Sequence, residues 1–173
     1  MGELIEEIDW DGNVVAVHPK EALKQRMFPH RVSLIIPRAE GKKFILCRRA
    51  KDKHPFPDTW CCAVGGKVSA GESDEDAAIR EVKEEIGKAA PLIRVASFKY
   101  DESDYKAIFT LFTTKNPLDE EKVNLDPGEI QYLKAFTISE IKDMIEKTPN
   151  EFAPTFREAL KAFEDGLKTK TIL

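Results

Sequence analysis

Short stretches in which hydrophobic and polar positions alternate, separated by turn residues, occupy much of the chain. Alternation with a period of two is typical of half-buried β-strands. Near the N-terminus the turn dipeptide Asp11-Gly12 separates two such stretches, so residues 3–18 predict a β-hairpin, and Pro19 predicts the start of a short helix. The other predicted strands cover residues 32–37, 44–48, 60–64, 92–100, 105–114 and 130–136, and those at 92–100 and 105–114 form a second hairpin.

Three later segments carry hydrophobic residues three or four positions apart, the spacing of one face of an α-helix. The first begins after Ser73, a suitable amino-terminal cap, and ends at Gly87, a common carboxyl-terminal stop. Its apolar face is expected at Ile79, Val82 and Ile86. The second is expected to be capped by Thr137 or Ser139 and to end before Pro149, and the third lies near the C-terminus.

Composition narrows the class of protein without naming its chemistry. The 173 residues carry a formal net charge of −4 and are 42% hydrophobic, which is ordinary for a soluble domain. The acidic balance argues against a basic nucleic-acid-binding surface, and no apolar run is long enough to span a bilayer. Three cysteines, two of them adjacent, suit a reducing cytoplasm better than a disulfide framework. Strands mixed with a few helices predict an α/β (α+β) fold with a sheet covered on both faces.

The first predicted helix carries three glutamates, Glu81, Glu84 and Glu85, at positions i, i+3 and i+4. Residues at this spacing share one helix face, and like charges there repel by roughly 0.2–0.5 kcal/mol per pair. A divalent cation would turn that repulsion into binding, because Mg²⁺ takes oxygen ligands and typically uses one or two carboxylates plus substrate phosphates. The alternative is a solvated acidic face in which Glu84 pairs with Lys88.

The sequence around these glutamates resembles the motif of the Nudix hydrolases, G-x5-E-x7-R-E-U-x-E-E-x-G-U, where U is a bulky aliphatic residue. The departure is Lys88 at the final aliphatic position. The residues in register are Gly66, Glu72, Arg80, Glu81, Val82, Glu84, Glu85 and Gly87. The resemblance implies the Nudix α/β/α sandwich with a mixed sheet, and one domain over 1–173. That domain comprises an N-terminal hairpin and short helix (1–28), a core (about 29–147) and a C-terminal helix (about 154–167).

The same resemblance implies catalytic roles for the motif residues. Glu81, Glu84 and Glu85 are expected to hold the metal or act as general base, with Glu81 and Glu84 as the alternatives for the base. The backbone carbonyl of Gly65, just before the motif, is expected as a further metal ligand. Arg80 is expected to pair with an acidic residue of the motif and to orient it, because a guanidinium–carboxylate pair is planar and bidentate.

A further acidic metal ligand is expected outside the motif. Glu129 is preferred because it precedes an apolar strand, and the alternatives are Asp126 and the acidic run at 101–104. The expected metal is Mg²⁺, with Mn²⁺ as a possible substitute.

A stretch upstream of the motif reads R-R-x3-K-x3-P-x2-W and resembles the isopentenyl-diphosphate isomerase branch of the superfamily. In that branch the second arginine and the lysine contact the diphosphate, which implies substrate binding by Arg49 and Lys53, together with Gly66 and Lys67 of the motif loop. The alternative is an ordinary solvated basic loop. The isomerase also uses a cysteine and a histidine where this chain has Gly65 and Lys67, so the isomerase chemistry is not expected.

We therefore predict an Mg²⁺-dependent Nudix pyrophosphohydrolase that cleaves a diphosphate linkage in a nucleoside di- or triphosphate or a nucleotide conjugate. The alternatives are an isopentenyl-diphosphate delta-isomerase and a non-catalytic ligand sensor. The expected partner is a small-molecule diphosphate, with no nucleic acid and no membrane, and the protein is expected to be a cytoplasmic monomer or homodimer. His30 matches an isomerase metal ligand in position only and is expected to be structural.

Overall fold

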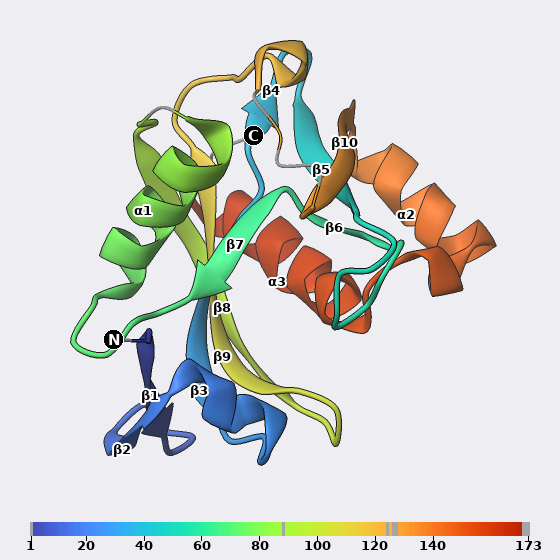
Figure 1. Ribbon diagram of the computed structural model, residues 1–173. Helices are drawn as coiled ribbons and strands as arrows, with labels where there is room; N and C mark the ends of the chain where they lie inside the picture. The colour runs from blue at the N-terminus through green and yellow to red at the C-terminus, as the bar shows by residue number, and fades with distance from the viewer. Residues whose placement is uncertain (1, 88, 124, 126–127, 171–173) are drawn as a thin grey trace.

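The computed structural model describes residues 2–87, 89–123, 125 and 128–170, and its strands form a hairpin and two larger sheets (Figure 1). The hairpin pairs β1 (Leu4–Ile8) with β2 (Val14–Pro19), as the alternating pattern predicted, and Gly12 in its turn has a φ of +88°. The short helix expected after it is a 3₁₀ helix, η1 (Lys20–Lys24).

One larger sheet has the strand order β7-β3-β9-β8. Its members are β7 (Val64–Lys67), β3 (His30–Ile35), β9 (Lys106–Thr114) and β8 (Leu92–Asp101). The central pair, β3 and β9, is parallel and the outer pairs are antiparallel, so the sheet is mixed as expected. The β8–β9 hairpin confirms the second hairpin predicted from the sequence.

The other sheet is centred on β5 (Lys43–Arg49), which pairs with three strands. These are β10 (Ile130–Phe136), β4 (Arg38–Ala39) and β6 (Trp60–Cys62). The strand expected at 60–64 is therefore wrong in one respect, since the chain leaves β6 and enters β7 of the other sheet at Val64. Gly65 and Gly66 lie inside β7 instead of ending a strand.

Helices α1 (Asp74–Ile86) and α3 (Pro154–Lys170) lie on opposite faces of the β7-β3-β9-β8 sheet (Figure 1). Adjacent residues of β9 show the two layers, because Leu111 packs in the cluster that contains the buried residues of α3 and Phe112 in the cluster that contains those of α1. Successive residues of a strand point to opposite faces, so both are buried in separate cores. The arrangement is the α/β/α sandwich that the sequence predicted.

The cap of helix α2 (Ile138–Lys147) is Thr137, one of the two residues predicted for it. Thr137 accepts a hydrogen bond from the Glu140 amide, and the Glu140 side chain accepts one from the Thr137 amide, which makes a capping box. Two short 3₁₀ helices, η2 (Glu120–Lys122) and η3 (Pro149–Glu151), complete the elements. Among the described residues, no helix has the length and apolar character needed to cross a membrane.

Two helix predictions need correction. Ile79 was expected on the apolar face of α1, but it is 48% exposed, and the buried residues of that helix are Ala77, Ala78, Val82 and Ile86. The last helix continues to Lys170, beyond the expected end near residue 167. A Cβ at Gly166 would lie 2.5 Å from the Val95 carbonyl oxygen, so this glycine permits close packing of α3 on β8 and does not terminate the helix.

Candidate active site

Helix α1 and strand β7 hold the Nudix-like motif in place through local interactions. Ser73 caps α1 by accepting a hydrogen bond from the Asp76 amide at 3.0 Å, and Gly87 ends it with a left-handed φ of +79°. The loop between β7 and α1 turns at Gly71, whose φ is +78°. These caps fix the helix with Glu81 lying against Gly66 of β7.

Arg80 organises the motif through four partners. Its Nε and Nη2 donate to the two carboxylate oxygens of Glu72 at 2.9 and 3.0 Å, and Nη2 also donates to the Lys67 carbonyl at 3.1 Å. Its Nη1 donates to Glu81 Oε1 at 2.6 Å and lies 3.5 Å from Glu84 Oε2. The bidentate pair with Glu72 fixes the guanidinium, which in turn fixes the Glu81 carboxylate, as expected for an orienting residue.

The Glu81 carboxylate packs directly on the backbone of β7 at Gly66. A Cβ built on Gly66 would lie 1.9 Å from Glu81 Oε1, so any side chain at this position would displace the Glu81 carboxylate. Gly66 was expected in the motif loop as a substrate-binding residue, and the structure gives a different physical reason for the glycine. It leaves room for the carboxylate beside the strand that contains Gly65. Burial raises the pKa of Glu81, while its bond to Arg80 acts in the opposite direction.

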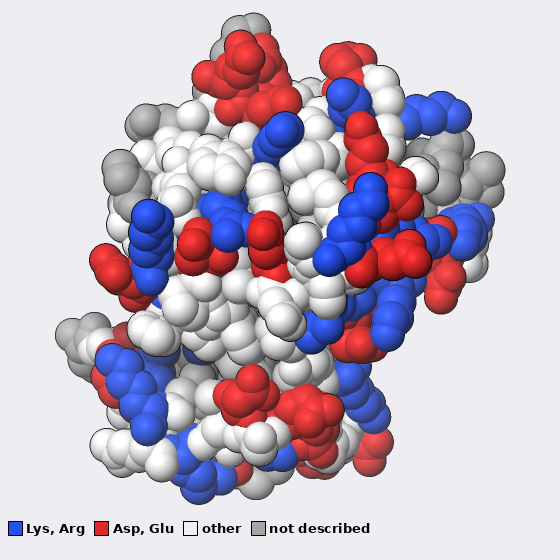
Figure 2. Space-filling model, turned by 90° about the vertical axis from the view of Figure 1, so that its right-hand side faces the viewer, with Lys and Arg blue, Asp and Glu red and all other residues white. Residues whose placement is uncertain are grey.

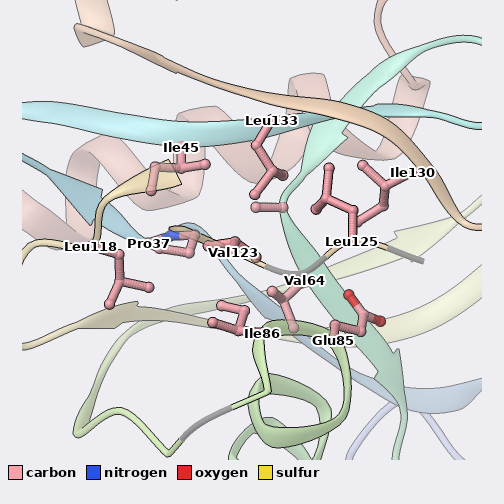
Figure 3. Close-up of a pocket in the computed structure, with 11 residues that line it drawn as sticks. Pro37, Ile45, Val64, Glu85, Ile86, Leu118, Val123, Leu125, Ile130 and Leu133 are labelled. Atoms are coloured by element: carbon pink, nitrogen blue, oxygen red, sulfur yellow. The ribbon is translucent and has the colours of Figure 1, made fainter. Parts of the chain in front are cut away.

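Glu85 is the most strongly perturbed carboxylate of the motif. Burial raises its pKa to about 8, and the neighbouring Glu81 and Glu129 add to the effect. The carboxylate lies at the edge of an apolar pocket, and it is the only ionisable group among the described residues lining that pocket (Figure 3). Val64, Ile86 and Ile130 belong to this lining. Glu84, by contrast, is largely exposed, at 58% for its side chain.

The residues fit a divalent cation, although the described part of the chain contains no group of three His, Cys, Asp or Glu side chains already gathered for a metal. Glu81 and Glu85 supply two neighbouring carboxylates that are largely shielded from solvent, and burial is the main cause of their raised pKa values. Mg²⁺ needs only one or two carboxylates and fills its remaining positions with water and substrate phosphate.

The predicted substrate-binding residues lie near these glutamates. Lys53 pairs with Glu129, the acid expected to be a metal ligand, and Lys53 also lowers the pKa of Glu85. Arg49 donates from Nη2 to the Lys53 carbonyl at 3.4 Å. Glu129 is thus close to Glu85, as expected for an outer ligand, but in this structure its carboxylate neutralises a lysine.

Lys67, at the end of β7, is also drawn into the site. Burial lowers the pKa of its ammonium group; Lys20 and Lys53 shift it the same way, and Glu3 and Glu81 oppose them. No ion pair or side-chain hydrogen bond of Lys67 occurs within the described part of the chain. A buried cation without an anionic partner is suited to a phosphate.

Two further groups at the site were not expected to contribute. Cys61, interpreted from the sequence as a packing residue, is hydrogen bonded to Cys47, which lowers the pKa of its thiol, and the nearby positive charge of Arg49 acts in the same direction. Lys20, the first residue of η1 after the N-terminal hairpin, lies in the neighbourhood of Lys67. Neither follows from the motif, because both positions depend on how β6 and the hairpin pack. The alternative ligand Asp126 and the motif departure Lys88 lie outside the described residues.

His30 is structural, as expected. It is buried, its Nδ1 lies 3.0 Å from the Phe28 carbonyl oxygen, and its Nε2 lies 3.3 Å from the Tyr105 hydroxyl. Burial lowers its pKa to about 4, so the imidazole is neutral at physiological pH. Burial likewise raises the pKa of Tyr105 to about 12, so the phenol stays protonated and can donate to the ring.

In this α/β/α sandwich, Arg80 of α1 holds the Glu81 carboxylate, which lies against Gly66 of β7. Fold and site together define a Nudix-type phosphohydrolase. The model of the NUDIX domain matches residues 27–158, and the chain belongs to this family of hydrolases. The chain is 27% identical over 167 residues to a prenyl-diphosphate phosphatase of Methanosarcina mazei, covering 94% of this chain and 96% of that protein. It is 29% identical over 169 residues to an isopentenyl-diphosphate delta-isomerase of Nocardia farcinica, covering 91% and 92%. The fold matches that of DR0079 from Deinococcus radiodurans with a TM-score of 0.80 and 19% identity, over 93% of this chain and 99% of that one.

Proposed function

We propose that this protein is an Mg²⁺-dependent hydrolase that cleaves a diphosphate linkage at the site formed by α1, β7 and the 49–53 segment. The observation that carries the proposal is that the carboxylates of Glu81 and Glu85 lie near the cationic side chains of Lys53 and Lys67, with Arg49 bonded to the Lys53 backbone. A diphosphate is a polyanion that needs both metal and cationic side chains to neutralise it.

Glu81 and Glu85, with the Gly65 carbonyl, would hold the cation. When bound, Mg²⁺ supplies neutralisation of the charge on the phosphoryl oxygens and the leaving group. Arg49, Lys53 and Lys67 orient the diphosphate from the other side. For Lys53 this requires its ammonium to exchange its contact with Glu129 for one with phosphate, which frees Glu129 to act as a ligand.

A glutamate must take a proton from the attacking water, and Glu81 and Glu84 are the alternatives. Their surroundings differ, since Glu81 is buried and bound to Arg80 whereas Glu84 is largely exposed. If Glu81 is the base, its raised pKa places the acid limb of the activity profile above the ordinary range for glutamate. A limb that disappears in Glu81→Gln and persists in Glu84→Gln would assign the base to Glu81, and the reverse would assign it to Glu84.

The group attached to the diphosphate has two candidates. The motif resemblance favours a nucleoside di- or triphosphate or a nucleotide conjugate. A prenyl diphosphate is supported by the Methanosarcina mazei phosphatase, which matches almost the whole chain. An isomerase reaction has less support, because Gly65 and Lys67 occupy the positions where the isomerase uses cysteine and histidine.

The test is a panel of nucleoside di- and triphosphates, nucleotide conjugates and prenyl diphosphates, incubated with protein and Mg²⁺. Products are resolved as phosphate, pyrophosphate, monophosphate or isomer. We expect phosphate or pyrophosphate release that needs Mg²⁺ and is lost in Glu85→Gln. Isomer formation without phosphate release would favour the isomerase, and binding without turnover of any compound would favour the sensor.

A further inference from the structure

Two cysteines face each other across adjacent strands next to the active site. Cys47 of β5 is directly opposite Cys61 of β6 in the antiparallel register, and their sulfur atoms are 3.3 Å apart. Directly opposed residues in antiparallel strands have Cα atoms about 4.5–5.5 Å apart, within the range that disulfides span. The sulfurs need to approach by roughly 1.3 Å to reach a bonding distance of about 2.0 Å.

The surroundings of the pair favour chemistry at Cys61. Its sulfur shares a 3.3 Å hydrogen bond with that of Cys47, and this contact and the nearby positive charge of Arg49 both lower the pKa of its thiol. Cys61 is partly exposed, whereas Cys47 is buried and donates to the Cys62 carbonyl at 3.1 Å. A partly exposed thiol beside a cation, with a second thiol in reach, is the arrangement of a redox-active pair.

We propose that Cys47 and Cys61 form a reversible disulfide when the protein meets a peroxide. In the first step the Cys61 thiolate attacks one peroxide oxygen, the O–O bond breaks, and a sulfenic acid forms; the departing hydroxide takes up the proton that the thiol released and becomes water. In the second, the Cys47 sulfur attacks the Cys61 sulfur, the S–O bond breaks, and a second water leaves with the thiol proton. Two thiols are oxidised and one peroxide is reduced to two waters. Excess thiol reductant reverses the reaction.

The disulfide would affect substrate binding at the active site through Arg49. Closing the S–S bond draws the Cys61 sulfur toward Cys47 and removes the thiol that lies near the Arg49 guanidinium. Arg49 Nε already lacks a hydrogen-bond partner, so the remaining contact that the structure shows for the side chain is the 3.4 Å bond to the Lys53 carbonyl. This consequence rests on the proposed diphosphate hydrolysis, in which Arg49 binds substrate, whereas disulfide formation itself does not.

The experiment titrates free thiols and maps masses in the whole protein before and after hydrogen peroxide, followed by reduction with dithiothreitol. We expect the three thiols to fall to one. The peptides containing Cys47 and Cys61 should become linked, with a mass lower by two hydrogen atoms, and the reductant should restore all three thiols. In parallel, the oxidised protein should show a KM for diphosphate substrate raised several-fold, with kcat nearly unchanged.

Cys62→Ser is the matched control, because Cys62 is buried on the neighbouring position and should leave the cross-link intact. Cys47→Ser should abolish the link and leave Cys61 to oxidise further to sulfinic acid. Three thiols surviving peroxide, or a sulfinic acid at Cys61 without a link to Cys47 in the wild-type protein, would overturn the proposal. A link that forms without any change in KM would overturn the connection to Arg49. Failure of hydrolysis itself would show in the reduced protein and would leave the thiol result intact.

Discussion

Replacing Gly66 with alanine tests how tightly the catalytic helix is seated on β7. The new Cβ would lie 1.9 Å from Oε1 and 2.7 Å from Oε2 of Glu81, closer than non-bonded atoms approach. To regain ordinary van der Waals separation, the Glu81 carboxylate must move by about 1 Å or more. That movement also disrupts the 2.6 Å bond from Arg80.

A displacement of about 1 Å in a catalytic group can reduce the rate by about 10²-fold. At about 1.36 kcal/mol for each factor of ten, this corresponds to roughly 2.7 kcal/mol of lost transition-state stabilisation. The assay is kcat/KM for Mg²⁺-dependent phosphate release, with thermal unfolding measured in parallel. We expect the Mg²⁺ concentration required for half-maximal rate to rise as well, because Glu81 is a proposed ligand.

Gly71→Ala is the control for this substitution. Gly71 has a φ of +78°, and no described atom lies within 4 Å of the position that an added Cβ would take, so the variant strains only the loop backbone, by about 1–2 kcal/mol. It should lower the unfolding temperature and leave kcat/KM of the folded protein close to wild type. If Gly66→Ala retains activity within about threefold of wild type in a folded protein, the role assigned to this contact is refuted.

Three further predictions concern charge, the arginine clamp and packing. Because the pKa of Glu85 is about 8 when folded and 4.5 ordinarily, the folded state keeps a proton that the unfolded chain releases. The melting temperature of metal-free protein should therefore fall as pH rises from 4.5 to 8, and Mg²⁺ should restore it at pH 8. Glu85→Gln should flatten this pH profile, and a variant profile parallel to that of the wild type would contradict the prediction. Arg80→Lys cannot keep the bidentate bond to Glu72, and kcat/KM should drop by about 10–100-fold. An unchanged kcat/KM would exclude the orienting role of Arg80. Gly166→Ala should lower the free energy of unfolding in urea by about 1–3 kcal/mol through its clash with Val95, with normal kcat; no loss would contradict close packing there.

One face of the molecule carries a mixture of acidic and basic side chains, which matches the nearly balanced charge of the chain. On the face drawn in Figure 2, acidic and basic side chains are interspersed over the same elements, and neither sign forms a continuous field. The proposed chemistry therefore depends on individual cationic side chains near the motif glutamates: Arg49, Lys53 and Lys67. Lys67 is notable among them because burial lowers its pKa while no anion of the described chain pairs with it.

The motif helix and most strands could be predicted from the sequence because their signals are local. The caps at Ser73 and Gly87, the period-two strands and the hairpin turn depend on residues a few positions apart. The spacing of Glu81, Glu84 and Glu85 likewise places them near one another in any helix. Ile79 was predicted wrongly because helical spacing alone does not say how wide the covered face is, and the smaller Ala77 and Ala78 are buried instead.

The sequence alone determined the Nudix motif, the pattern of strands and helices and the class of chemistry, because each depends on residues that are a few positions apart. Only the tertiary structure showed that Gly66 makes room for Glu81, that Glu85 borders an apolar pocket, and that Lys53 meets Glu129. It also placed Cys61 opposite Cys47 beside Arg49. These contacts join residues that are distant in sequence, and they depend on the packing of α1 and the two sheets. Burial, and with it the raised pKa values of Glu81 and Glu85, arises from that packing and has no signature in the order of residues.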